Sequence, residues 1–299
     1  MFLVLPLIAL ACGSTEKPAA KARNGLIAAT TDRGIVLLAP NGSVKNRVPG
    51  TEDAVEVLWS PRGDELAFST RYLELYVVRP DGSERTLVLR NTVEPAWSPD
   101  TKSFAVAKFE CALSDDACRA DPSNLDLYTA AADGSDLRKV VDAPDYQGNP
   151  TWSPDGEWIA FLGSNGLYQI RSDGSDQRLL AEKPGLFRET SWSPDGSKIA
   201  FVDFAKNPVN GMDIALVDVK TRKQTLLSRH GSEFGPTWSP DGKQIAFQAS
   251  SRCLKTSTCT PYESWEIWVM DADGRNPHRI TKGGFGRPSW APASAPSED

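Results

Sequence analysis

The sequence of 299 residues has little of what common enzymes and nucleic-acid-binding proteins need. It contains two histidines, and it has no Gly-x-Ser-x-Gly elbow, no His-Glu-x-x-His pair and no glycine-rich phosphate loop. The usual hydrolase, metalloprotease and nucleotide-binding motifs are therefore missing. Acidic residues outnumber basic ones, 39 to 33, for a net charge of −6, and no cluster of Lys or Arg offsets the excess. We therefore expect no nucleic-acid partner.

Beyond residue 11 no apolar stretch is long enough to span a bilayer. Residues 2–11 are an uncharged apolar run, too short for a span but typical of the apolar region of a secretory signal. The Ala that precedes Cys12 resembles a bacterial lipoprotein cleavage site, where the cysteine is acylated and becomes the N-terminus. Ala9 stands where Leu is usual and no Lys or Arg comes first, so an ordinary signal peptide or a fortuitous apolar start is the alternative. We expect a signal peptide over 1–11, and a lipidated cysteine with a polar tether over 12–23.

Cysteine is also scarce, with five in the chain. Apart from Cys12, they form two close pairs, Cys111 with Cys118 and Cys253 with Cys259. An even number in local pairs predicts disulfides that close exposed loops in an oxidising compartment. Zinc ligation and unpaired buried thiols are the alternatives, but the spacings are wide for zinc and no His lies near either pair.

What the sequence does have is a repeat. A tryptophan followed by a small residue and proline recurs at intervals of about 40 to 55 residues, a period typical of stacked or radial units. The six copies begin at Trp59, Trp97, Trp152, Trp192, Trp238 and Trp290. Each unit is too small to bury its own apolar face, so the units must pack against one another. The tryptophans and the Ile-Ala-Phe runs that follow them are expected to form this core between units.

One repeat shows the order of its elements. Trp238 to Gly242, which reads Trp-Ser-Pro-Asp-Gly, has the residues of a tight turn. Short β-rich runs follow at 245–249 and 266–270, and the second ends at Asp273-Gly274, a pair that favours a hairpin. A last strand covers 279–281, so each unit is predicted to have four antiparallel strands.

The two ends of the chain predict how the units close. Residues 26–30, 35–38 and 44–48 read as the second, third and fourth strands of a unit whose first strand is missing, and 288–292 supplies it. A unit made from both termini closes a ring and removes exposed sheet edges. We therefore predict an all-β fold, a six-bladed β-propeller over 24–292 with a flexible tail at 293–299. The expected blades are 24–50 with 286–292, 53–90, 92–142, 146–182, 187–229 and 233–283.

The Trp-Ser-Pro-Asp-Gly-x-x-Ile-Ala-Phe sequence, followed by a strand such as Ile-Trp-Val-Met-Asp-Ala-Asp-Gly, resembles the WD-like repeat of the TolB propeller family. The resemblance covers residues 24 to 292. It implies the propeller fold and an envelope-assembly or receptor-like role, although one such scaffold hosts receptors, platforms, hydrolase lids and lyases. TolB carries an extra α/β domain before its propeller, so the contacts of that domain are not carried over here.

The channel mouth is the expected recognition surface. In a propeller the loops between second and third strands and the connections between blades share one face, and blades three and six, which carry the cysteine pairs, lie opposite each other. Loops closed by disulfides lose less entropy when they bind a partner, although they could equally serve only to resist proteases. His230, in a connection between blades, is a further candidate for this site.

The residue three places before each tryptophan should line the mouth. The series is Glu56, Glu94, Asn149, Glu189, Gly235 and Arg287. The three carboxylates are a candidate calcium site, or could hold an amine or arginine of an inserted peptide, with Arg287 setting the charge balance. Alternatively they pair with Arg287 and Arg188 or stay solvated.

From these features we expect a protein without catalytic activity and without an obligatory cofactor, lipid-anchored and periplasm-facing in the bacterial envelope, at the outer membrane. It is expected to be a monomer whose channel mouth binds a protein or peptide. The alternative is a calcium-dependent propeller hydrolase or lyase that uses the channel carboxylates.

Overall fold

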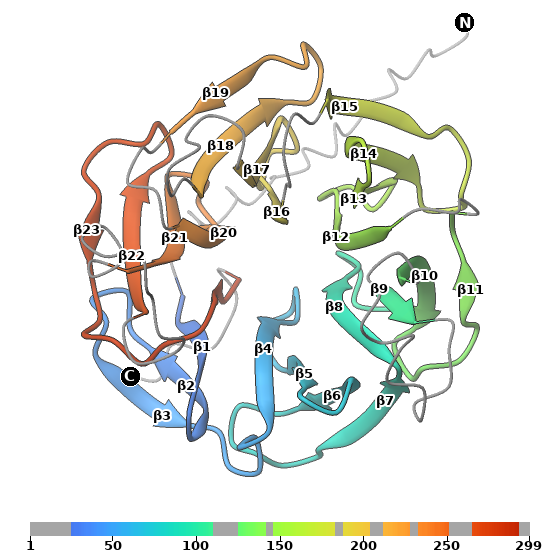
Figure 1. The fold of residues 1–299 in the computed structure, drawn as a ribbon. Helices are drawn as coiled ribbons and strands as arrows, with labels where there is room; N and C mark the ends of the chain where they lie inside the picture. Colours follow the sequence, from blue (N-terminus) through green and yellow to red (C-terminus); the bar gives the residue numbers. More distant parts are fainter. Residues whose placement is uncertain are drawn as a thin grey trace, which may run out of the picture.

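Six radial sheets surround one axis in the computed structural model, which describes residues 25–109, 125–141, 146–182, 188–203, 212–227, 233–250 and 265–292. Each sheet has four antiparallel strands, and the described ranges contain no helix (Figure 1). The predicted fold, a six-bladed propeller of four-stranded blades, is confirmed.

The strands of the first three blades are given from the axis outward. Blade one consists of β24 (Pro288–Trp290), β1 (Ile27–Thr31), β2 (Gly34–Leu38) and β3 (Val44–Arg47). Blade two consists of β4 (Ala54–Trp59), β5 (Leu66–Thr70), β6 (Glu74–Val78) and β7 (Thr86–Arg90). Blade three consists of β8 (Thr92–Trp97), β9 (Ser103–Phe109), β10 (Leu125–Ala131) and β11 (Arg138–Lys139).

The other three blades repeat this order. Blade four consists of β12 (Gln147–Trp152), β13 (Trp158–Gly163), β14 (Gly166–Arg171) and β15 (Arg178–Glu182). Blade five consists of β16 (Arg188–Trp192), β17 (Lys198–Asp203), β18 (Asp213–Asp218) and β19 (Gln224–Leu226). Blade six consists of β20 (Glu233–Trp238), β21 (Gln244–Ala249), β22 (Glu266–Asp271) and β23 (His278–Arg279).

Blade one joins the two ends of the chain, as predicted. β24 pairs with β1 in antiparallel register, with Trp290 opposite Ile27 and Pro288 opposite Ala29. In Figure 1 the red strand from the C-terminal end therefore lies beside the blue strands of the N-terminal end. This pairing closes the ring, because the C-terminal strand β24 serves as the first strand of blade one.

The Trp-Ser-Pro turns determine how the first and second strands of a blade pair. In blade six the Ser239 hydroxyl donates to the Asp241 carboxylate at 2.7 Å and accepts the backbone N–H of Gln244 at 2.9 Å. Gly242 closes the turn with a φ of +67°, in the region where glycine has no side-chain clash. The turn residues thus satisfy one another and set the register of β20 against β21.

The core lies between blades. The phenylalanines of the Ile-Ala-Phe runs and their equivalents are fully buried, namely Phe68, Phe104, Phe161, Phe201 and Phe247. One cluster combines Ala160 and Leu162 of blade four with Trp192 and Phe201 of blade five. Since neighbouring blades share each such cluster, the apolar face of one repeat is buried by the next, as the repeat predicted.

Candidate functional site

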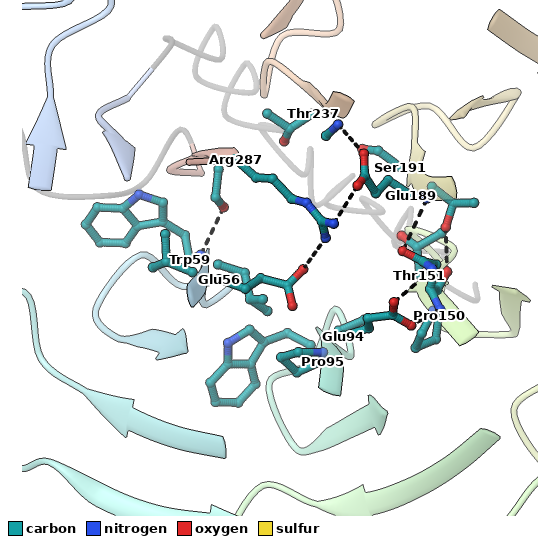
Figure 2. A pocket seen from close by; sticks show the side chains of 18 of the residues that line it. Glu56, Trp59, Glu94, Pro95, Pro150, Thr151, Glu189, Ser191, Thr237 and Arg287 are labelled. Atoms are coloured by element: carbon teal, nitrogen blue, oxygen red, sulfur yellow. Dashed lines mark hydrogen bonds and ion pairs between the residues drawn. The ribbon is translucent and has the colours of Figure 1, made fainter. Parts of the chain in front are cut away.

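The innermost strands surround an axial pocket of about 260 Å³. All six positions that lie three residues before a tryptophan contribute to its lining (Figure 2). We call this set the ring: Glu56, Glu94, Asn149, Glu189, Gly235 and Arg287. The repeat register therefore brings these residues together at one level of the channel.

A backbone irregularity gives the ring its geometry. Four ring residues adopt the left-handed conformation, with φ of +54° at Glu94, +49° at Asn149, +50° at Glu189 and +56° at Gly235. The pairing of the first and second strands shifts register at the same places. A bulge of this kind leaves one residue unpaired and re-aims it. The backbone N–H of the bulged residue is thus turned away from its own blade.

The ring side chains satisfy these N–H groups across the gaps between blades. The Glu94 carboxylate accepts the N–H of Asn149 at 2.7 Å and its side-chain Nδ2 at 3.0 Å. Asn149 Oδ1 in turn accepts the N–H of Glu189 at 3.2 Å, and Glu189 Oε2 accepts the N–H of Gly235. Blades three to six are therefore joined by one repeated contact, in which each ring side chain caps the next ring residue.

Arg287 completes the ring by a different contact. Its guanidinium lies 2.5 Å from Glu189 Oε1, as an ion pair without hydrogen-bond geometry, and its Nη1 donates to Glu56 Oε1 at 3.3 Å. On the way it passes over Gly235, where a Cβ would lie 2.9 Å from Arg287 Cγ. Figure 2 shows the side chain extended across the channel between Glu56 and Glu189. A glycine in blade six thus makes room for an arginine of blade one.

The charges of the ring are coupled. Burial raises the pKa of Glu56 to about 7, Arg287 opposes that rise, and the Glu94 and Glu189 carboxylates add to it. Burial lowers the pKa of Arg287, but the surrounding carboxylates outweigh burial and hold it above its ordinary value. Among the described lining residues, the ring contains three carboxylates and one guanidinium.

From the ring, the pocket extends toward only one face of the propeller. Its walls come from residues that follow the ring residues in each strand, and the preceding residues Val55, Val93 and Phe234 do not line it. The wall positions two places after the ring residues are Leu58, Ala96, Thr151, Ser191, Thr237 and Ser289. The pocket therefore runs toward the Trp-Ser-Pro turns, whereas the sequence had suggested a site on the face of the second-to-third-strand loops.

These wall residues were missed by the sequence reading. Each precedes a repeat tryptophan by one position, so the same register that found the ring could have found them. Four of the six carry hydroxyls, and Ser289 accepts the N–H of Trp59 through Oγ at 3.1 Å. The walls are thus small and polar.

The possible calcium site stays a prediction, and its proposed ligands have other partners in the structure. Oxygens of Glu56, Glu94 and Glu189 are held by Arg287, Asn149 and the backbone of Gly235. Over the described ranges no group of three or more His, Cys, Asp or Glu side chains is placed to hold a metal ion. Among the described residues, Arg287 brings positive charge to the ring.

Several predicted site residues fall outside the described ranges. They are Cys12, Cys111, Cys118, Cys253, Cys259 and His230. The other histidine, His278, lies exposed on the outer strand β23. In the part of the chain that the structure covers, we find no helix with the length and apolar character needed to cross a membrane.

Comparisons with known proteins agree with this architecture. The structure of TolB from Acinetobacter baumannii superposes with a TM-score of 0.70 at 18% identity over 89% of this chain, which spans 66% of that one. A putative TolB from Agrobacterium tumefaciens gives 0.66 at 20% identity, covering 88% and 91% of the two chains. An oligogalacturonate lyase in complex with manganese gives 0.56 at 17% identity, covering 83% and 70%. The family model described as the TolB beta propeller domain matches residues 50–293, and the chain therefore belongs to that family.

Proposed function

We propose that this protein is a non-catalytic propeller of the bacterial cell envelope that binds a protein or peptide partner in its axial channel. The observation that carries the proposal is the pocket itself, to which all six blades contribute a ring residue. Concave sites with a few fixed polar groups are the usual places of ligand recognition. TolB relatives support the envelope setting.

The ring is better arranged for recognition than for turnover. A general acid or base must reach the reacting proton. Glu189 is held by Gly235 and Arg287, and Glu94 is held by Asn149. Such fixed carboxylates suit a static, preorganised contact. The lining contains neither a histidine nor a cysteine among the described residues, so it offers no cysteine nucleophile and no serine activated by histidine there.

The remaining parts of the proposal come from the sequence. Acylation of Cys12 would anchor the protein on the periplasmic side of the outer membrane, as a monomer. Disulfides Cys111–Cys118 and Cys253–Cys259 would close two loops near the channel, and His230 would stand beside them. These loops are predicted on the face opposite the Trp-Ser-Pro turns, so they would flank a partner that reaches the ring end of the channel.

A pull-down tests this function. The protein, immobilised through its C-terminus, is incubated with solubilised envelope at low salt, and retained proteins are identified by mass spectrometry. We expect one partner to be retained, to be lost as salt rises and to survive a chelator.

The second candidate is a calcium-dependent hydrolase or lyase, which the fold likeness to an oligogalacturonate lyase favours. Its signature is calcium-dependent turnover of an acidic oligosaccharide that chelation abolishes. Such turnover without any retained partner would contradict the binding proposal.

A further inference from the structure

A groove crosses the face of the Trp-Ser-Pro turns between blades three and four. It has a volume of about 630 Å³ and is bounded by four turns, two from each of these blades. The turns that contain Pro99 and Asp155 lie nearer the axis, whereas those that contain Asp136 and Ser172 lie on the outer side. Trp152 lines both this groove and the axial pocket. The groove is therefore a second cavity, next to the axial pocket but separate from the ring.

Trp152 gives the groove an accessible aromatic surface. The other five repeat tryptophans are buried, each with 6–8% of its surface exposed, whereas Trp152 is only partly buried. Over the described ranges, no Lys or Arg side chain stacks on the Trp152 ring. Blade four shows elsewhere what such a ring can bind, because the Arg171 guanidinium lies 4.7 Å from the centre of the Trp158 ring. A planar cation that enters the groove can therefore stack on Trp152 in the same way.

Two carboxylates line the inner part of the groove, and we call Asp100 and Asp155 the turn carboxylates. In each of them Oδ1 accepts a serine hydroxyl, from Ser98 at 2.6 Å and from Ser153 at 2.5 Å. These hydrogen bonds hold the pKa of both carboxyls below the usual value, so both are ionised at neutral pH. Over the described part of the chain, neither Oδ2 has a hydrogen bond or an ion pair. Each turn carboxylate thus has one oxygen fixed by its turn and one that can bind a ligand.

The equivalent groove between blades five and six carries its own lysines. The Lys243 Nζ atom lies 3.8 Å from Asp241 Oδ2 of the same turn, and Lys198 of blade five lines the groove as well. The positions that correspond to Lys243 and Lys198 are Glu157 in blade four and Ser103 in blade three. The groove between blades three and four therefore has the turn carboxylates but not the two lysines, so a cation from outside meets no internal competitor at these positions.

Arg138 bridges the outer end of the groove. Its Nε donates to Thr129 Oγ1 of blade three at 3.0 Å, and its Nη2 donates to the carbonyl of Ser172 in blade four at 2.7 Å. The guanidinium is thus held on the outer strand β11, where Asp136 also lines the groove, whereas the turn carboxylates belong to the inner turns. Lys102 is close to one of these turns in the sequence but does not line the groove. The inner end is therefore the place where a cation meets carboxylates.

We propose that the groove between blades three and four is a second binding site, which receives an arginine side chain of a protein partner. The guanidinium stacks on the Trp152 ring, and its N–H groups donate to the turn carboxylates. A planar cation with five donors suits this combination better than a compact ammonium. An exposed ion pair contributes little by itself, so the arginine acts as one contact of a larger protein interface. This site does not depend on whether a segment also enters the axial pocket.

Blocked tripeptides test the chemistry. Acetyl-Gly-Arg-Gly-amide is titrated into the full-length protein and followed by ligand-observed NMR, with citrulline or lysine replacing arginine in matched peptides. We expect the arginine peptide to bind about tenfold more tightly than the citrulline peptide, which has nearly the same shape without the charge, and more tightly than the lysine peptide. Equal binding of arginine and citrulline, or tighter binding of lysine, would overturn the proposal. Free arginine that bound more tightly than the blocked peptide would indicate an amino-acid site and contradict the protein partner.

An internal lysine tests the site. Glu157→Lys gives blade four the residue that blade six has, so the new ammonium should compete for Asp155 and weaken the arginine peptide at least about fivefold. Glu157 is an exposed residue that pairs with Arg171, so the change should leave the fold intact. The matched control is Glu182→Lys, the same change of charge at the far end of the outer strand β15 of blade four. The control should bind like the parent, and equal binding by the two variants would contradict the site.

Loss of a turn carboxylate tests the same site from the other side. Asp155→Asn keeps the size of the side chain and an oxygen for the Ser153 hydroxyl, and it should weaken the arginine peptide about fivefold. The matched control is Asp195→Asn, because Asp195 occupies the same turn position in blade five and accepts the equivalent hydrogen bonds from Ser193 and Ser197. The control should bind like the parent. If Asp155→Asn binds the peptide as well as the control does, the guanidinium does not lie in this groove.

Discussion

Single residues decide the shape of the channel, and Gly235 is the clearest case. It lies at φ +56°, and a Cβ there would meet three atoms of the Arg287 side chain within 3.4 Å. Its N–H is held by Glu189, the residue that also pairs with Arg287. Residue 235 must therefore adopt a positive φ, and it must also have no side chain where Arg287 passes. Alanine would meet neither requirement.

Gly235→Ala should lower the free energy of unfolding by about 2–4 kcal/mol, since strain at positive φ adds to the displacement of Arg287. Gly50→Ala is the matched control, because Gly50 also has a positive φ, +71°, but a Cβ added there would have no neighbouring atom within 4 Å. That control should lose only about 1–2 kcal/mol in urea unfolding. Equal losses would show that Arg287 does not depend on the glycine.

The raised pKa of Glu56, about 7, makes a prediction about pH. An acid whose pKa is higher in the folded state stabilises the fold fully below its unfolded pKa, and this contribution is lost as pH rises through 7. Between pH 5 and 8 the parent should therefore lose on the order of 2 kcal/mol relative to Glu56→Gln. Urea unfolding of both proteins at several pH values measures this, and parallel profiles would contradict it.

At the scale of elements, the turns after the repeat tryptophans show how much of the backbone conformation the local sequence determines. Four blades place glycine at the last turn position, with positive φ at Gly63, Gly156, Gly196 and Gly242. Blade three has Thr101 there, held at φ +64°. The turn forms all the same, because Ser98 and Asp100 make the same hydrogen bonds as their counterparts in blades four to six. The surrounding strands thus impose a conformation that threonine does not favour.

Thr101→Gly should therefore raise the free energy of unfolding by about 0.5–1 kcal/mol, because relief of strain exceeds the added chain entropy of glycine. The reciprocal change, Gly156→Thr, should cost about 1–2 kcal/mol at the equivalent position of blade four. Chemical denaturation of both variants measures the difference. If Thr101→Gly is destabilising, the threonine must contribute more through its bond to the Asp100 carbonyl than its strain costs.

For the whole molecule, the sequence predicted the six blades and their closure because one repeat, read six times, fixes the equivalent positions. It also brought the ring residues together, since their spacing from the tryptophans is constant. The contacts within the ring could not be predicted. They depend on bulges where three of the four residues with positive φ, Glu94, Asn149 and Glu189, are not glycine. The path of Arg287 over Gly235 joins two blades, so it exists only once the ring has closed.

The placement of the whole molecule at a membrane rests on Cys12. The apolar run at 2–11 and the small residue before Cys12 predict cleavage and acylation there. Several acyl chains give stable anchoring where one chain gives only marginal binding, so the mature protein should sediment with membranes from an expressing bacterium. Mass spectrometry should find an acylated N-terminal Cys12, and Cys12→Ser should leave the protein unacylated with its propeller folded. An unmodified Met1, or cleavage at another residue, would contradict the anchor and leave the channel to meet its partner in another setting.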